Sequence, residues 1–106
     1  MTKYLIKADY TAEGVKGLLK TGGTIRKQAI EDTVKKLGGQ LDSFYYSFCE
    51  HDVYTVCALP DAATAAAVIL SINASGLVSV SAEVLVDPEE IDKAKDISVN
   101  YRTPGN

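Results

Sequence analysis

The stretch "QLDSFYYSFCEHDVYTVCALP", from Gln40 to Pro60, decides the fold because it has the pattern of two β-strands joined by a polar turn. Its first part, "QLDSFYYSF" (Gln40–Phe48), is rich in aromatic residues. Its last part, "VYTVCALP" (Val53–Pro60), is rich in β-branched residues and ends at a proline. Both compositions favour strands, and the polar residues "CEHD" interrupt the apolar pattern between them. We therefore predict two consecutive strands at the centre of the chain.

The segments before and after this pair of strands each contain one further strand and helical segments. Before it, "KYLIKADY" (Lys3–Tyr10) alternates and predicts a strand, followed by the helical segments "AEGVKGLLK", capped by Thr11, and "IRKQAIEDTVKKLGG", capped by Thr24. After it, Asp61 is expected to cap the helix "AATAAAVILSINAS", and "LVSVSAEVLV" (Leu77–Val86) alternates like a strand. The segment "DPEEIDKAKDIS" begins with a cap, a proline and two acids, which predicts a C-terminal helix.

The element order is therefore β-α-β-β-α-β with a C-terminal helix, in one domain over residues 1–106. This order is typical of the ferredoxin-like α+β sandwich, an antiparallel sheet with two helices on one face. The other face carries Leu5, Leu85 and several tyrosines. A second copy of the same sheet would cover these apolar side chains, so we predict a two-fold homodimer with facing sheets. The alternative is a monomer in which the C-terminal helix and tail cover the open face.

Composition narrows the classes of function. The chain has 106 residues, 46% hydrophobic and 24% charged, with a formal net charge of −3. This mild acidity argues against nucleic acid as a partner, because phosphate binding needs a basic face. No apolar run approaches the roughly 20 residues of a membrane span, and no signal peptide is visible at the start of the sequence. We expect a cytoplasmic protein with Cys49 and Cys57 as reduced thiols.

The turn "CEHD" contains the only histidine of the chain and supports three hypotheses. The first is a metal site using Cys49 and His51, but in an extended backbone at most two of these four side chains point the same way. The second is acid–base chemistry, with His51 transferring a proton, Asp52 orienting it and Cys49 as a nearby thiol. The third is a structural turn, in which Asp52 binds backbone amides.

Other residues could complete a site in a cleft between the sheet and the helices. Tyr10, Tyr54 and Lys7 are the expected neighbours of the proton-transfer group, with the tyrosines shaping a pocket. Lys7 and Glu83 are expected on one face of neighbouring strands, where they could form an ion pair. Arg26 and Lys27 could meet an anion, but a solvated helix face is the simpler interpretation, and no motif indicates a cofactor.

Four stretches of the chain resemble a known family. They are "YLIKADYTAEGVKGLLKTGG" (Tyr4–Gly23), "LGGQLDSFYYSF" (Leu37–Phe48), "INASGLVSV" (Ile72–Val80) and the tail "SVNYRTPG". Together they are similar to GYD-domain proteins, which belong to the dimeric α+β barrel superfamily. The resemblance implies two ferredoxin-like protomers pressed sheet to sheet.

The motif that names this family, Gly-x-Tyr-Asp, falls on Cys49-Glu50-His51-Asp52, and only Asp52 matches it. Related dimeric barrels include cofactor-free monooxygenases, haem-degrading enzymes and simple binding modules, so the resemblance implies no particular activity.

The sequence therefore predicts a protein that binds a small organic molecule, or a cofactor-free acid–base enzyme, acting in a cleft of a dimeric barrel. The alternatives are a non-catalytic binding or assembly module and a metal-dependent site on Cys49 and His51. The expected partners are further copies of the chain, as a homodimer or higher homo-oligomer, and a small-molecule ligand, with neither nucleic acid nor membrane.

Overall fold

The computed structural model describes residues 1–106. Its elements are β1 (Thr2–Tyr10), α1 (Ala12–Thr21), α2 (Gly23–Lys36), β2 (Gln40–Tyr46), β3 (Val53–Leu59), α3 (Ala62–Ala74), β4 (Val78–Leu85) and α4 (Pro88–Lys95). The strands form one sheet in the order β2-β3-β1-β4, and every neighbouring pair is antiparallel. The structure confirms the ferredoxin-like α+β fold. None of its helices is both long enough and apolar enough to cross a lipid bilayer.

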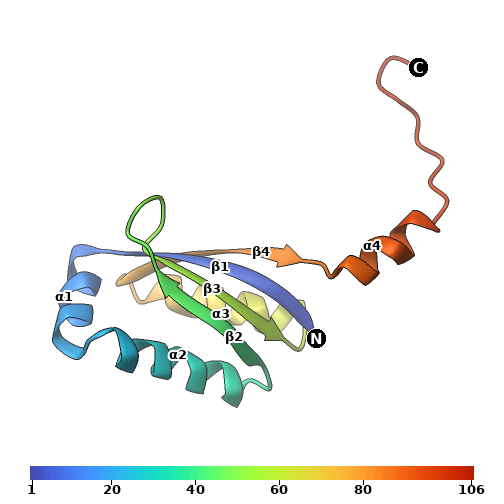
Figure 1. Ribbon diagram of the computed structural model, residues 1–106. Coiled ribbons are helices and arrows are strands. Elements are labelled where there is room, and N and C mark those ends of the chain that lie inside the picture. Colours follow the sequence, from blue (N-terminus) through green and yellow to red (C-terminus); the bar gives the residue numbers. More distant parts are fainter.

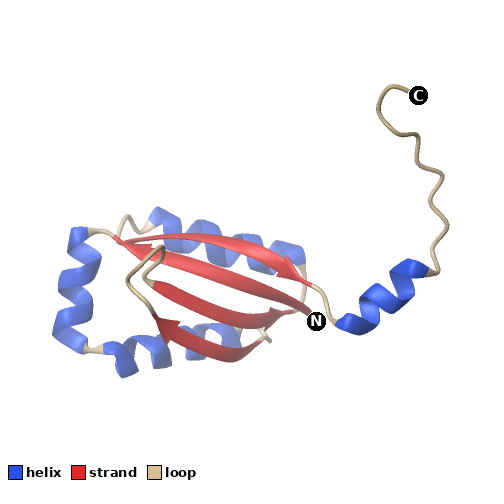
Figure 2. Ribbon diagram, turned by 45° about the horizontal axis from the view of Figure 1, so that its top comes forward, coloured by secondary structure: helices blue, strands red, loops and turns tan.

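The sheet has one covered face and one open face. Helices α2 and α3 lie behind the sheet, α1 lies beyond one end of it, and the opposite face is uncovered (Figure 2). Alternation along β1 sends Tyr4, Ile6 and Ala8 into the core, while Leu5 and Lys7 point to the open face. The core cluster consists of Tyr4, Ile6, Ala8, Val34, Val53, Cys57, Leu59, Ala65, Val78 and Val80.

Two of the four predicted helix caps, Thr11 and Asp61, form the expected hydrogen bond, whereas Asp87 precedes α4 without a capping hydrogen bond from its side chain. The Thr11 hydroxyl accepts from the Gly14 amide at 3.2 Å, and the Asp61 carboxylate accepts from the Thr64 amide at 2.8 Å. The prediction of Thr24 as a cap is wrong, because α2 already begins at Gly23. Gly22 ends α1 and precedes α2 with φ at +86°, a conformation that glycine adopts without strain, so the chain turns there rather than at Thr24.

The C-terminal arm, residues 86–106, leaves the body of the molecule. Every residue of this arm is exposed, and α4 and the tail point away from the end of β4 (Figure 1). The chain has a radius of gyration of 17.0 Å, against about 13 Å for a compact domain of this length. The arm does not cover the open face, which contradicts the monomer alternative in which it would.

Candidate functional site

The turn between β2 and β3 is closed by backbone hydrogen bonding. The Ser47 amide donates to the Asp52 carbonyl at 2.9 Å, and Phe48 takes a positive φ of 58° at the start of the turn. The Phe48 ring stacks on Tyr46 at a centroid distance of 5.7 Å. Cys49 and Glu50 lie at the tip and are exposed. The turn therefore holds its shape through its ends, while its central side chains are free.

His51 turns back onto β1. Its Nδ1 lies 3.0 Å from Oδ2 of Asp9, and its ring meets Tyr54 edge-on at a centroid distance of 5.7 Å. The hydrogen bond from His51 is the main cause that lowers the pKa of Asp9 below its ordinary value. These contacts fix the ring orientation at the edge of the open face. The group that orients the only histidine is thus Asp9, not Asp52.

Asp52 holds the strands together instead. Its carboxylate accepts from the Tyr10 amide at 2.9 Å, and its own amide donates to the Ala8 carbonyl at 3.0 Å and to the Asp9 carboxylate at 3.2 Å. The predicted pairing of Asp52 with His51 is therefore wrong. Neighbouring residues in extended backbone point apart, and the Asp52 side chain meets the end of β1. Asp52 has the structural role that the third hypothesis gave it.

Lys7 and Glu83 form the predicted ion pair across β1 and β4 on the open face. This hydrogen bond raises the pKa of Lys7 and lowers the pKa of Glu83. Lys7 stands opposite Tyr54 in the register of β1 and β3. Lys7, His51 and Tyr54 therefore share the open side of the sheet.

Tyr10 does not join this group. Alternation along β1 places Tyr10 on the covered face, where it packs against the core, whereas Tyr54 in β3 points to the open face beside His51. The expectation that Tyr10 and Tyr54 shape one pocket is wrong. Of the predicted site residues, Lys7, His51 and Tyr54 therefore lie on the open face, whereas Tyr10 lies on the covered face.

The structure does not bring together a set of ligands that would support the metal hypothesis. No group of three or more His, Cys, Asp and Glu side chains in the molecule is arranged to hold a metal ion. His51 engages Asp9 through Nδ1, and Cys49 stands exposed at the tip of the turn. The other cysteine, Cys57, is buried in the core, and burial raises the pKa of its thiol to about 11.

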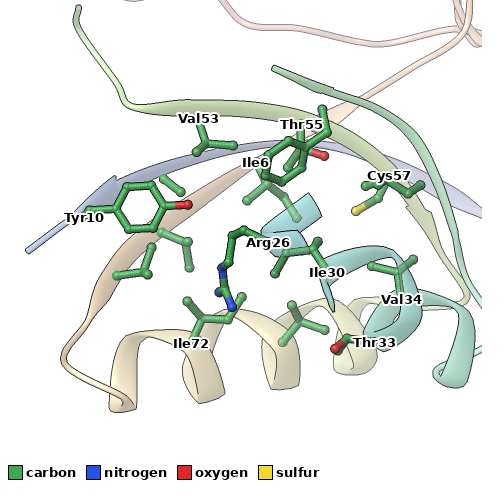
Figure 3. Close-up of a pocket in the computed structure, with 16 residues that line it drawn as sticks. Ile6, Tyr10, Arg26, Ile30, Thr33, Val34, Val53, Thr55, Cys57 and Ile72 are labelled. Atoms are coloured by element: carbon green, nitrogen blue, oxygen red, sulfur yellow. The ribbon is translucent and has the colours of Figure 1, made fainter. Parts of the chain in front are cut away.

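A cavity lies between the sheet and the two helices behind it (Figure 3). It measures about 60 Å³, and 13 of the 16 residues that line it are hydrophobic. The sheet contributes side chains such as Ile6 and Val53, and the helices contribute Ile30 and Ile72. This volume holds only part of a small molecule, and the lining is mostly apolar, as it is in small-molecule sites.

The cavity exists because α2 and α3 stand apart. A groove between them, of about 470 Å³, shares Ile30, Val68 and Ile72 with the cavity and opens to solvent. Its rim is formed in part by the small side chains of Ala29, Ala67 and Ser71, which cannot reach across to the opposite helix. The groove therefore gives a small molecule a path to the interior.

Arg26 lies where the groove meets the cavity and lines both. Figure 3 shows its side chain running from α2 toward Ile72 on α3, with the hydroxyl end of Tyr10 pointing into the same space. Sequence reasoning favoured a solvated helix face for Arg26, but the structure places it partly buried at the cavity. The signal was available, because Arg26 lies four residues before Ile30 on the apolar stripe of its helix.

The comparisons with known proteins give one match. The protein-family model of the GYD domain matches residues 4–94, which is most of the chain. No curated protein and no solved structure shows a significant match.

Proposed function

The chain belongs to the GYD-domain family, and we propose that it binds a small organic molecule in the groove between helices α2 and α3 and in the cavity that lies between this groove and the sheet. The observation that carries this proposal is an open groove of about 470 Å³ that leads into an apolar cavity of about 60 Å³. Burial of an apolar ligand there contributes roughly 25 cal/mol for each Å² removed from water. A few polar groups at the mouth would fix its orientation.

The proposal is tested by blocking the groove with a large side chain. Val68 on α3 lines both groove and cavity, whereas Leu70 on the same helix is 68% exposed. The probe is N-phenylnaphthylamine, a neutral dye that fluoresces in apolar surroundings. We expect saturable binding to the native protein and to Leu70→Trp, and no binding to Val68→Trp. Circular dichroism checks that both variants fold. Dye binding that is unchanged by Val68→Trp would place the ligand elsewhere and contradict the proposal.

We also propose that two copies associate through the open faces of their sheets. Support comes from the apolar side chains Leu5, Tyr54 and Val56 on that face, and from the apolar residues of the exposed arm. Only 13 of the 106 residues are buried in the single chain, so this chain leaves much of its apolar surface for a partner. A second copy fits this surface because the same side chains would meet across a two-fold axis.

Sedimentation equilibrium tests this association. The native chain of 11.3 kDa is expected at twice that mass at micromolar concentration. Leu5→Asp puts a charge in the open face and should give the monomer mass. Val15→Asp puts the same charge on α1, where the side chain is already exposed, and should leave the dimer intact. A native protein that sediments as a monomer would refute the proposal.

Acid–base chemistry at His51 is the second candidate function. The contact with Asp9 and the edge of Tyr54 give the imidazole a fixed orientation, as proton transfer requires. In the proposed dimer this group would lie at the rim of the interface. A panel of small carbonyl compounds is incubated with the native protein, with His51→Gln and with Glu50→Gln, a control at the exposed turn. Turnover lost only in His51→Gln supports an enzyme, and absence of turnover in the native protein leaves a binding module.

A further inference from the structure

Arg26 is a cation without an acidic partner. None of the ion pairs in the molecule includes its guanidinium. Two acidic side chains of α1 and α2 pair with lysines: Glu13 contacts Lys16 at 3.1 Å, and Glu31 faces Lys35 at 3.9 Å. A partly buried guanidinium loses part of its hydration without gaining a counter-ion. This desolvation costs free energy, which a bound anion would offset.

The polar groups around Arg26 suit an anion. The Tyr10 hydroxyl points into the same space, and the Tyr46 hydroxyl donates to the Gly23 carbonyl at 3.0 Å. Burial is the main cause that raises the pKa of Tyr46 to about 12, and the nearby Tyr10 adds to it. The Tyr46 phenol thus stays protonated at neutral pH. The end of the cavity near Arg26 offers a positive charge and the Tyr10 hydroxyl, and no acidic side chain lines the cavity. Glu13 borders a neighbouring hollow with Arg26 and is paired with Lys16.

The rest of the cavity offers nothing to a polar ligand. Its two threonine hydroxyls already donate to the backbone, Thr33 to Ala29 at 3.0 Å and Thr55 to Ser43 at 2.6 Å. From Tyr10 the lining runs along β1 to Ile6, roughly 13 Å at the rise of a strand, and remains apolar. A ligand that satisfies both regions has an anionic head and an apolar chain.

We propose, as a refinement that rests on the proposed function, that the ligand is a small amphipathic carboxylic acid whose carboxylate pairs with Arg26 and whose chain occupies the groove and the apolar cavity behind it. The guanidinium can donate two parallel hydrogen bonds to a carboxylate, a geometry that a lysine cannot provide. The groove between α2 and α3 admits the chain, and the head group remains at the mouth near solvent.

Isothermal titration with decanoate, decanol and decylammonium tests the proposal, since the three differ in head group alone. The native protein is expected to bind decanoate about tenfold more tightly than decanol, and decylammonium more weakly than either. Arg26→Gln should bind decanoate and decanol equally, and Arg26→Lys should keep part of the preference. Lys27→Gln removes a cation from the exposed neighbouring position and should behave as the native protein.

The possible failures are distinguishable. Equal binding of decanoate and decanol by the native protein, lost in Val68→Trp, would overturn the carboxylate preference and keep the cavity. A preference that survives Arg26→Gln would overturn the role of Arg26. Absence of binding by all three probes, in a protein shown to be folded, would overturn this inference and the proposed function together.

Discussion

His51 Nδ1 lies 3.0 Å from Oδ2 of Asp9, a residue 42 positions earlier in the chain. The contact connects the turn after β2 to the last residues of β1 and sets the direction of the imidazole. Asp52, the adjacent acid, faces the Tyr10 amide instead. The lone histidine is thus held by the sheet and not by its neighbour in sequence.

The first prediction concerns the titration of Asp9. Its pKa is lowered mainly by the hydrogen bond from His51, so the stability from this contact is present above the ordinary aspartate pKa of about 3.9 and is lost as pH falls through the lowered value. His51→Ala should move the Asp9 pKa back up, as followed by carboxyl carbon NMR. Asp61 is the internal control, because the Thr64 amide lowers its pKa and the variant leaves that contact intact. An Asp9 titration unchanged by His51→Ala would contradict the contact.

The second prediction separates the two acids of the turn. Asp52→Ala removes the acceptor of the Tyr10 amide and should cost about 2 kcal/mol in the free energy of unfolding. Asp52→Asn keeps an acceptor oxygen and should cost less. Glu50→Ala changes an exposed side chain and should stay within about 0.5 kcal/mol of the native protein. Urea unfolding measures all three, and equal values for Asp52→Ala and Glu50→Ala would remove the structural role of Asp52.

The third prediction concerns two glycines of α1. A Cβ at Gly14 would lie 2.2 Å from the Leu77 carbonyl oxygen, so Gly14→Ala must push α1 away from the start of β4 and should lower stability by about 1–3 kcal/mol. Nothing lies within 4 Å of a Cβ at Gly17, so Gly17→Ala should raise stability by about 1 kcal/mol through helix propensity. Thermal unfolding should move in opposite directions for the two variants. A shift of the same sign would disprove the close approach.

The fourth prediction concerns the cysteines. Cys49 is exposed on the turn, whereas Cys57 is buried and its thiol pKa is raised to about 11. Iodoacetamide at pH 8 should therefore modify one thiol of the folded protein, and Cys49→Ser should abolish this reaction. In Cys57→Ser the rate should match that of the native protein, and denaturant should expose the second thiol. Fast labelling of folded Cys49→Ser would show that Cys57 is accessible.

Local patterns predicted the fold well. Alternation for the first and last strands, and aromatic or β-branched composition for the two central strands, assigned all four strands with ends within about two residues. The caps at Thr11 and Asp61 were correct because each depends on residues three positions apart. The cap at Thr24 was wrong because the turn there is made by the backbone of Gly22. The ion pair of Lys7 and Glu83 followed from strand alternation once the two strands were placed side by side.

The sequence by itself therefore determined the elements, their order, the shared face of Lys7 and Glu83 and the family of the chain. The tertiary structure decided the rest: the pairing of His51 with Asp9, the separation of Tyr10 from Tyr54, and the place of Arg26 at an apolar cavity. The physical reason is the distance along the chain between the residues that determine each feature. Helix caps and strand alternation depend on neighbours within a few residues, whereas a site depends on the register of strands and the spacing of helices, which the packing of the whole chain sets.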